Sequence, residues 1–121
     1  MNSDSSNPVF DIEVALSHVD GDRELLSELV IMFLDDYPRT LDEAQNSILN
    51  RDHACLERVA HTLKGRLAFF GIRKAHPQVA ELEAMGREKN LAGAWKTLEE
   101  IKAAMEEVLA ELQSFSPGQS A

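Results

Sequence analysis

The stretch that decides the fold runs from Ala60 to Gly71 and reads AHTLKGRLAFFG. At the helical repeat of about 100° per residue, the apolar residues in and just before it fall on one stripe: Leu56, Val59, Leu63, Leu67 and Phe70. Such a stripe must face a core, so an amphipathic helix is predicted here. His61 lies about 160° from Leu63 on the same wheel, and its side chain is therefore predicted to stand in water.

On the outer face of this predicted helix, the neighbours of the histidine include two small residues. Gly65 and Ala68 flank His61, and Lys64 borders it. A glycine inside a helix costs roughly 1 kcal/mol of stability relative to alanine. A glycine beside an exposed imidazole therefore indicates that another molecule approaches the ring closely.

The motif HxLKG, which begins at His61, is followed by a small residue at Ala68 and by Gly71 ten positions after the histidine. This pattern resembles the histidine-containing phosphotransfer (HPt) domains of bacterial two-component phosphorelays. The resemblance extends over about residues 10–113. It implies an all-α fold, an antiparallel four-helix bundle with an additional short N-terminal helix.

The resemblance also implies a chemistry for His61. A neutral imidazole is a good nucleophile near neutral pH, so His61 would accept a phosphoryl group from an aspartyl-phosphate receiver domain and pass it to a response regulator. Lys64 would neutralise phosphoryl oxygens, and Gly65 and Ala68 would give the partner access. The receiver, in a response regulator or a hybrid sensor histidine kinase, would bring the aspartate and the Mg²⁺, so no metal or cofactor is expected on this chain.

Composition bounds the other possibilities. The chain has 121 residues, 44% of them hydrophobic, and this predicts one globular domain. The single cysteine, Cys55, excludes an internal disulfide and a cysteine metal cluster. No apolar run approaches the roughly 20 residues of a membrane span and no signal peptide is visible, so a cytoplasmic protein without membrane insertion is expected. The resemblance adds the expectation of a monomer.

Charge is unevenly distributed along the chain. The net charge is −9, which should repel nucleic acid and anionic lipid. Residues 51–74, however, hold six basic and two acidic residues, a net of +4 around His61. We expect this basic segment to serve a phosphoryl group and an acidic partner surface.

The remaining pattern gives the predicted architecture. Helices are expected at about residues 10–18, 22–49, 52–70 and 77–89, followed by a last helix that Asn90 caps. Pro38 lies inside the second segment, where the apolar phase carries across it and predicts one kinked helix. Gly71 is expected at the C′ position of the motif helix. Residues 1–9 and 114–121 are polar and predicted to be flexible tails.

Several side chains carry further expectations. Arg66 and Phe69 stand where the HPt family usually has a small and a polar residue. Phe69 is expected to be exposed and, with Arg58, to belong to the docking surface. The pair Asp35-Asp36 is interpreted as a solvated helix face, and Trp95 and the methionines as core.

Two further readings of the sequence compete with the carrier. Arg66 and Phe69 motivate a non-transferring module that binds and inhibits a receiver or a histidine kinase. A hydrolase with His61 as general base ranks last, because no nucleophile lies near it in the pattern. The chain has no Gly-rich phosphate loop and no kinase-like ATP-binding set, so it is expected to be a phosphoryl carrier and not an ATP-dependent enzyme.

Overall fold

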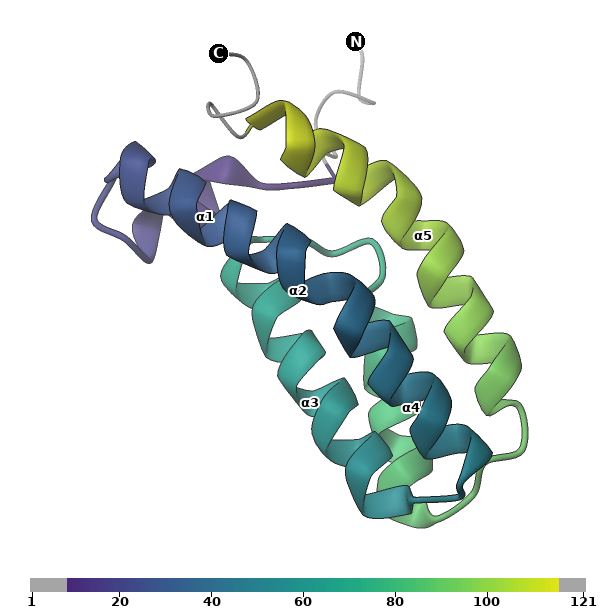
Figure 1. Cartoon of the computed structure of the whole chain (residues 1–121). Helices are drawn as coiled ribbons and strands as arrows, with labels where there is room; N and C mark the ends of the chain where they lie inside the picture. The colour runs from purple at the N-terminus through teal and green to yellow at the C-terminus, as the bar shows by residue number, and fades with distance from the viewer. Residues whose placement is uncertain (1–8, 116–121) are drawn as a thin grey trace, which may run out of the picture.

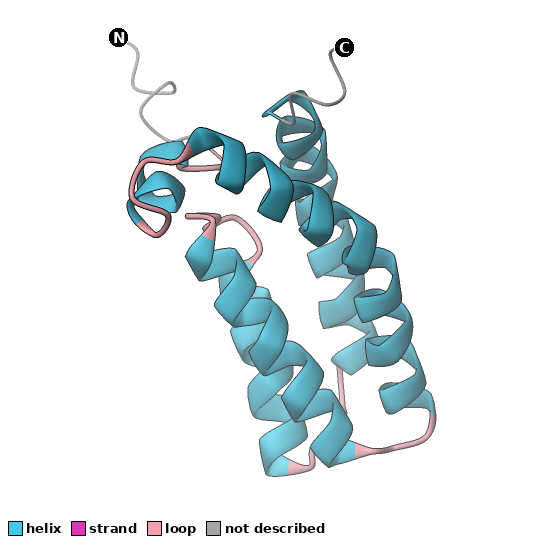
Figure 2. Cartoon of the chain, turned by 60° about the vertical axis from the view of Figure 1, so that its left-hand side comes forward, coloured by secondary structure: helices cyan, strands magenta, loops and turns pink. Residues whose placement is uncertain are grey.

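The computed structural model describes residues 9–115 as five helices, α1(Ile12–Ser17), α2(Arg23–Leu49), α3(His53–Phe69), α4(His76–Glu88) and α5(Ala94–Phe115). The helices α2 to α5 run alternately down and up (Figures 1 and 2). Each contacts the next along the chain, and α5 closes the bundle by packing against α2. The predicted four-helix bundle with a short N-terminal helix is confirmed.

Helix starts and stops follow the capping residues in the sequence. Asp11, Asp22 and Asp52 each accept a backbone hydrogen bond from the first turn of the helix that follows. Pro38 lies at an exposed position inside a continuous α2, where water can reach the carbonyl that loses its helical partner. The α2 segment is therefore one helix, as expected.

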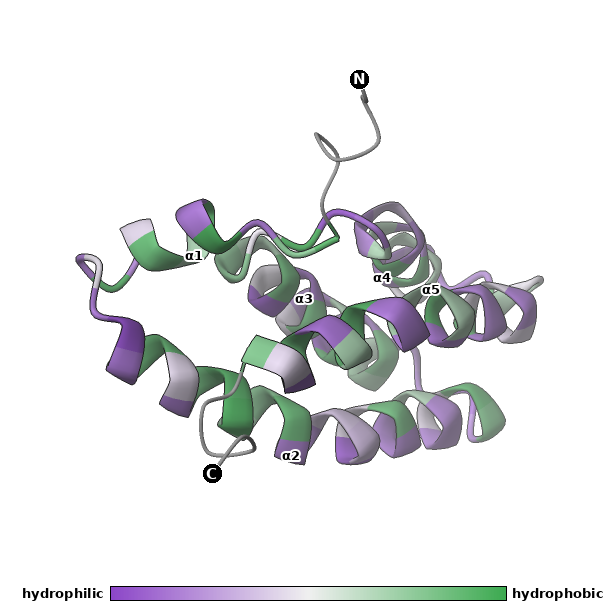
Figure 3. Cartoon of the chain, turned by 90° about the horizontal axis from the view of Figure 1, so that it is seen from above, coloured by the Kyte–Doolittle hydropathy of each residue, from purple (hydrophilic) through white to green (hydrophobic). Residues whose placement is uncertain are grey.

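The core lies between the four long helices. In Figure 3 the hydrophobic face of α2 turns toward the other helices and its hydrophilic face turns outward. The side chains that the structure buries fully include Leu26, Leu56, Leu67, Leu98, Ile101 and Leu112. The exposed large apolar residues include Leu25 at 41%, Leu49 at 66% and Trp95 at 44%, and the expectation that Trp95 belongs to the core is wrong. All three lie in the terminal turn of a helix, where neighbouring helices cover them least.

The predicted cap of the last helix is wrong. Asn90 accepts a hydrogen bond from the Ala92 amide inside the loop, and α5 begins only at Ala94. Gly93 adopts a φ of +84° immediately before the helix. The chain therefore turns at this glycine, because most side chains disfavour that conformation, and the helix starts after it.

The predicted tail boundaries also shift. Helix α5 continues through Ser114 to Phe115, whose ring packs edge-on against Phe10 at 5.7 Å between centroids. The Arg23 guanidinium lies 5.4 Å from the centre of the same ring. Val9 packs against the core as a partly buried residue. The rest of both predicted tails, residues 1–8 and 116–121, lies outside the described residues.

Candidate functional site

Helix α3 places His61 as the sequence predicted. Leu56, Val59, Leu63 and Leu67 are buried on the inner side of the helix, and the His61 side chain is 70% exposed on the outer side. The ring stands near the middle of the helix, next to residues whose side chains are buried in the bundle, Ala60 and Leu63. A partner molecule can reach it without opening the bundle.

One ring nitrogen of His61 is held by the neighbouring helix. His61 Nδ1 lies 2.7 Å from the Oε2 atom of Glu83, which belongs to α4. The Glu83 side chain is only 9% exposed, and its other oxygen, Oε1, lies 2.5 Å from Lys64 Nζ. Glu83 thus joins the histidine and the lysine of the motif in one network.

The charge of Glu83 decides the tautomer of His61. The hydrogen bond from Lys64 lowers the pKa of the Glu83 carboxyl, burial opposes this, and the His61 hydrogen bond lowers it again, with a net lowering. An ionised carboxylate only accepts hydrogen bonds. Nδ1 therefore carries the hydrogen that it donates to Glu83, and in the neutral ring Nε2 is left with its lone pair.

No role in the site was predicted for Glu83 from the sequence. A signal for it exists in the pattern of α4, because Glu83 lies four residues after the buried Val79 and three before the buried Gly86. It is a carboxylate on the apolar stripe of a helix. Buried carboxylates are rare unless they are paired, so this position indicated a cationic or proton-donating partner.

The two small residues beside His61 leave open space. A β-carbon built on Gly65 would meet no atom within 4 Å, and Ala68 is exposed. No packing within the described chain therefore requires glycine at position 65. The open space agrees with the expectation that another molecule occupies it.

Three of the six basic residues in residues 51–74 are neutralised by ion pairs within the described chain. Lys64 pairs with Glu83, Arg66 with Asp36 and Lys74 with Glu107. Arg58, three residues before His61, has no ion-pair partner among the described residues and lines a shallow hollow together with His61 and Glu83. Of the predicted cations near the ring, Arg58 is thus the one available to an anion.

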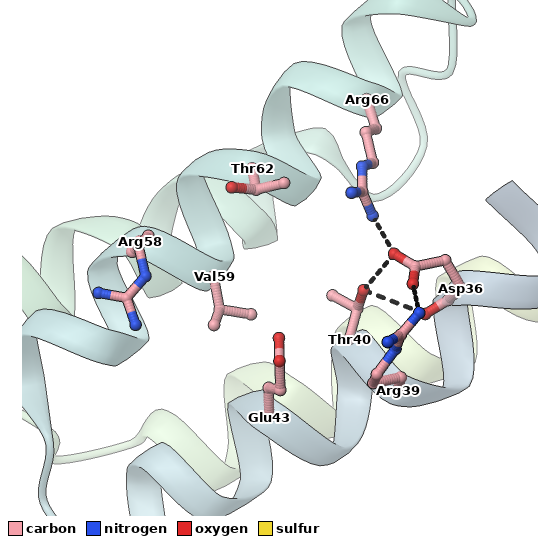
Figure 4. A pocket seen from close by; sticks show the side chains of 8 residues that line it. All are labelled: Asp36, Arg39, Thr40, Glu43, Arg58, Val59, Thr62 and Arg66. Carbon is pink, nitrogen blue, oxygen red and sulfur yellow. Dashed lines mark hydrogen bonds and ion pairs between the residues drawn. The ribbon is translucent and has the colours of Figure 1, made fainter. Parts of the chain in front are cut away.

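Arg66 turns toward α2 and away from the His61 face. Its Nη1 atom donates to Asp36 Oδ2 at 2.6 Å, and Arg39 binds the other oxygen of the same carboxylate at 2.5 Å. Figure 4 shows this cluster at one end of a groove of about 300 Å³ between α2 and α3. Both hydrogen bonds lower the pKa of Asp36. Asp36 is therefore an interhelical ion-pair partner, and its interpretation as a merely solvated residue is wrong.

Phe69 is only partly exposed, contrary to expectation. Its ring stacks on His18 with 4.9 Å between centroids, and His18 Nδ1 lies 2.9 Å from the Phe69 carbonyl oxygen. Phe69 lines a mainly apolar groove with Leu29 and Met32, which Asp36 and Arg66 also border. Met32 is 63% exposed, which corrects its assignment to the core.

Gly71 has the structural role that the sequence indicated. It follows the last residues of α3 with a φ of +69°, and its carbonyl accepts a hydrogen bond from the Asp11 amide at 3.1 Å. A β-carbon at this position would lie 2.7 Å from the Asp11 carbonyl oxygen. Gly71 thus lets the N-terminal segment pair with the loop after α3.

This geometry, an exposed mid-helix histidine with one nitrogen fixed, agrees with a comparison of the sequence with protein families. Residues 28–111 match the model of the Hpt domain, which is more than half of the chain. The chain belongs to the Hpt domain family. No curated protein and no solved structure matches it.

The family confirms the resemblance seen in the motif and fixes the class of activity. Hpt domains are phosphocarrier modules of two-component signalling, not kinases, and they interact with receiver or kinase domains. Among residues 9–115, no helix has the length and apolar character that a membrane crossing requires. The same residues contain no cluster of three His, Cys, Asp or Glu side chains that could hold a metal ion.

Proposed function

We propose that this Hpt domain carries a phosphoryl group on Nε2 of His61. The observation that supports the proposal is the contact between Nδ1 and the Glu83 carboxylate. A nitrogen that donates a hydrogen bond has no free lone pair, so the nucleophile of the neutral ring is the other nitrogen. The exposure of the side chain lets that nitrogen reach a partner's acyl phosphate.

The transfer follows from these roles. The Nε2 lone pair attacks the phosphorus of an aspartyl phosphate on a receiver domain, the N–P bond forms, and the P–O bond to the aspartate breaks and leaves a carboxylate. The ring keeps its Nδ1 proton and gains positive charge, which the Glu83 carboxylate stabilises. The receiver supplies the aspartate and the Mg²⁺. Passing the group to a response regulator is the same step in reverse.

Lys64 and Arg58 have separate parts in this proposal. Lys64 Nζ holds Glu83 and lies one turn after His61, so it can share its charge between that carboxylate and the phosphoryl oxygens. Arg58 lines the hollow beside the ring without an ion-pair partner in the described chain. We assign Lys64 to the transfer and Arg58 to the attraction of the acidic partner.

The docking surface in this proposal is the outer face of α3 with Arg58, Lys64, Gly65, Ala68 and the outer edge of Phe69. The residues assigned to the phosphoacceptor, His61, Lys64 and Glu83, all come from one chain, which favours a monomeric carrier. The phosphoryl group of such relays derives from ATP, so we place the carrier in the cytoplasm. The proposed partners are the receiver domains of a response regulator, a hybrid sensor histidine kinase or both.

The inhibitory module is the competing function. Arg66 and Phe69 motivated it, because they stand where the family usually has a small and a polar residue. The ion pair with Asp36 turns Arg66 toward α2, so this motive is weakened. If the chain is an inhibitory module, the His61→Gln variant should keep both receiver binding and biological effect. If the chain is a carrier, the same variant should keep binding and lose the effect.

The direct test is to incubate the chain with phosphorylated receiver domains and Mg²⁺. We expect an acid-labile, base-stable label on His61, and no label on the His61→Gln variant. His53→Gln is the matched control on the same helix and should label normally. Failure of every receiver in a broad panel to label His61 would contradict the carrier function.

A further inference from the structure

Helices α3 and α4 touch backbone to backbone at Gly86. This residue is buried. A β-carbon built on it would lie 2.7 Å from the Glu57 amide nitrogen, 2.9 Å from the His53 carbonyl oxygen and 3.0 Å from the Glu57 Cα atom. All three atoms are backbone, so no flexible side chain can move aside to admit a methyl group.

The point of contact lies one helical turn from the His61–Glu83 pair on both helices. Glu83 precedes Gly86 by three residues on α4, and His61 follows Glu57 by four residues on α3. Residues three or four apart lie on the same side of a helix. The spacing between the two backbones at Gly86 therefore sets how far Glu83 has to reach to meet the imidazole.

We infer that Gly86 is a positioning residue for the phosphoacceptor, because the close approach it permits seats the Glu83 carboxylate on His61 Nδ1. This inference rests on the proposed function and assigns it a residue outside the HxLKG motif. Gly86 touches neither the imidazole nor a phosphoryl group. It acts through the separation of the two helices and hence through the tautomer of His61.

The distances show that one methyl group is enough. Contacts of a real β-carbon begin at about 3.0 Å and become comfortable near 3.4 Å, so alanine at position 86 must open the 2.7 Å contact by about 0.3–0.7 Å. The Nδ1–Oε2 distance is 2.7 Å, and hydrogen bonds of this kind weaken beyond about 3.2 Å. The required separation of the helices is thus about as large as the lengthening, from 2.7 Å to about 3.2 Å, beyond which this hydrogen bond weakens.

The test compares Gly86→Ala with Gly65→Ala. Both replace a helical glycine by alanine, but position 65 has open space. Nitrogen-15 NMR of the histidine ring in the free protein reports which nitrogen carries the hydrogen. In the wild type and in Gly65→Ala we expect hydrogen on Nδ1. In Gly86→Ala we expect a shift toward the Nε2–H form that an unrestrained imidazole prefers, as in Glu83→Gln.

Transfer from a phosphorylated receiver is measured in parallel. It should slow by about tenfold to a hundredfold in Gly86→Ala, as expected when a reacting group is misplaced by a fraction of an ångström to an ångström. If wild-type protein is not labelled at all, the proposed function fails, while the NMR result still decides the role of Gly86.

Thermal unfolding separates positioning from mere loss of stability. A folded Gly86→Ala protein with an unchanged His61 tautomer would overturn the inference. If Gly86→Ala does not fold, Glu83→Asp replaces it, because this change withdraws the carboxylate by one methylene on the native backbone. An unchanged tautomer in Glu83→Asp would then overturn the inference, and a shift toward Nε2–H would support it.

Discussion

Glu83 contacts His61 through the interface of α3 and α4, although 22 residues separate them in the sequence. The same carboxylate holds Lys64. A buried glutamate with two partners fixes the ring and its tautomer and leaves the outer nitrogen free. In the proposed carrier, the nucleophile is thus prepared by a residue that the HxLKG motif does not contain.

The first prediction concerns the charge of Glu83. Glu83→Gln keeps the length of the side chain but removes the carboxylate that faces the positively charged ring during transfer. We expect the rate of transfer from a phosphorylated receiver to fall by about tenfold to a hundredfold. Quench-flow measurement with labelled receiver gives the rate.

The control for this variant is Glu81→Gln. Glu81 is an exposed neighbour on the same helix and has no ion-pair partner within the described residues, so its replacement changes the net charge equally. Equal rates in the two variants would assign the effect to net charge and contradict a role for Glu83 at the ring.

The second prediction concerns acid stability and the pair Asp36–Arg66. The pKa of Asp36 is lowered in the folded chain from 3.8, chiefly by the hydrogen bond from Arg66. A carboxyl with a lowered folded pKa adds stability above its unfolded pKa and loses it as the pH falls through the folded one. At pH 7, Arg66→Ser should therefore have a lower free energy of unfolding than the wild type. In strong acid this difference between the two proteins should disappear.

The magnitude should be small, because the Asp36 and Arg66 side chains are 27% and 40% exposed. We expect less than about 1 kcal/mol at pH 7, measured by urea unfolding across the pH range. Arg73→Ser is the control, since Arg73 is exposed and has no ion pair within residues 9–115. A difference between wild type and Arg66→Ser that persists unchanged in acid would show that the arginine stabilises by packing.

The sequence predicted what depends on local pattern. The periodicity of α3 was enough to place His61 outside and Leu63 inside, and Asp22 and Asp52 marked helix starts through their own hydrogen bonds. These features depend on residues within a few positions of each other. The family match confirms the fold class that this pattern indicated.

What the sequence left undecided depends on contacts between helices. Glu83 meets His61, and Arg66 meets Asp36, only once α4 and α2 lie beside α3. The exposure of Trp95 likewise depends on where the bundle ends, and hydrophobicity alone assigned it to the core. Asn90 was a good cap by type, but the φ of +84° at Gly93 moved the helix start beyond it.

The third prediction separates stability from docking along the apolar groove. Phe69→Ala removes a half-buried ring that stacks on His18, so it should destabilise by about 1–2 kcal/mol, less than the 3–5 kcal/mol of a fully buried phenylalanine. Receiver affinity should fall as well. Thermal unfolding and titration calorimetry measure the two effects.

Met32→Ala is the matched variant on the opposite wall of this groove. Its side chain is 63% exposed, so unfolding should change by less than about 0.5 kcal/mol while receiver affinity still falls. Normal affinity in both variants would place the receiver elsewhere on α3 and remove Phe69 from the docking surface.

The last prediction concerns the space beside the imidazole. Gly65→Gln fills the open position four residues after His61. The helix should be level in stability or gain up to about 1 kcal/mol, because glutamine is a better helix former than glycine and no atom lies within 4 Å of the new β-carbon. Transfer should nevertheless fall sharply, since the side chain occupies the space that the partner's loops need.

Gly65→Ala tests whether the loss of transfer depends on the size of the side chain at position 65. It should gain at least as much helix stability as Gly65→Gln, because alanine is the better helix former. It adds only a methyl group, however, so transfer should fall less than in Gly65→Gln. The Nδ1–Glu83 contact lies on the α4 side of the ring and should persist in both variants, which NMR of the imidazole verifies. A Gly65→Gln protein that transfers at the wild-type rate, with His61 in its native tautomer, would show that the receiver does not approach across this part of α3.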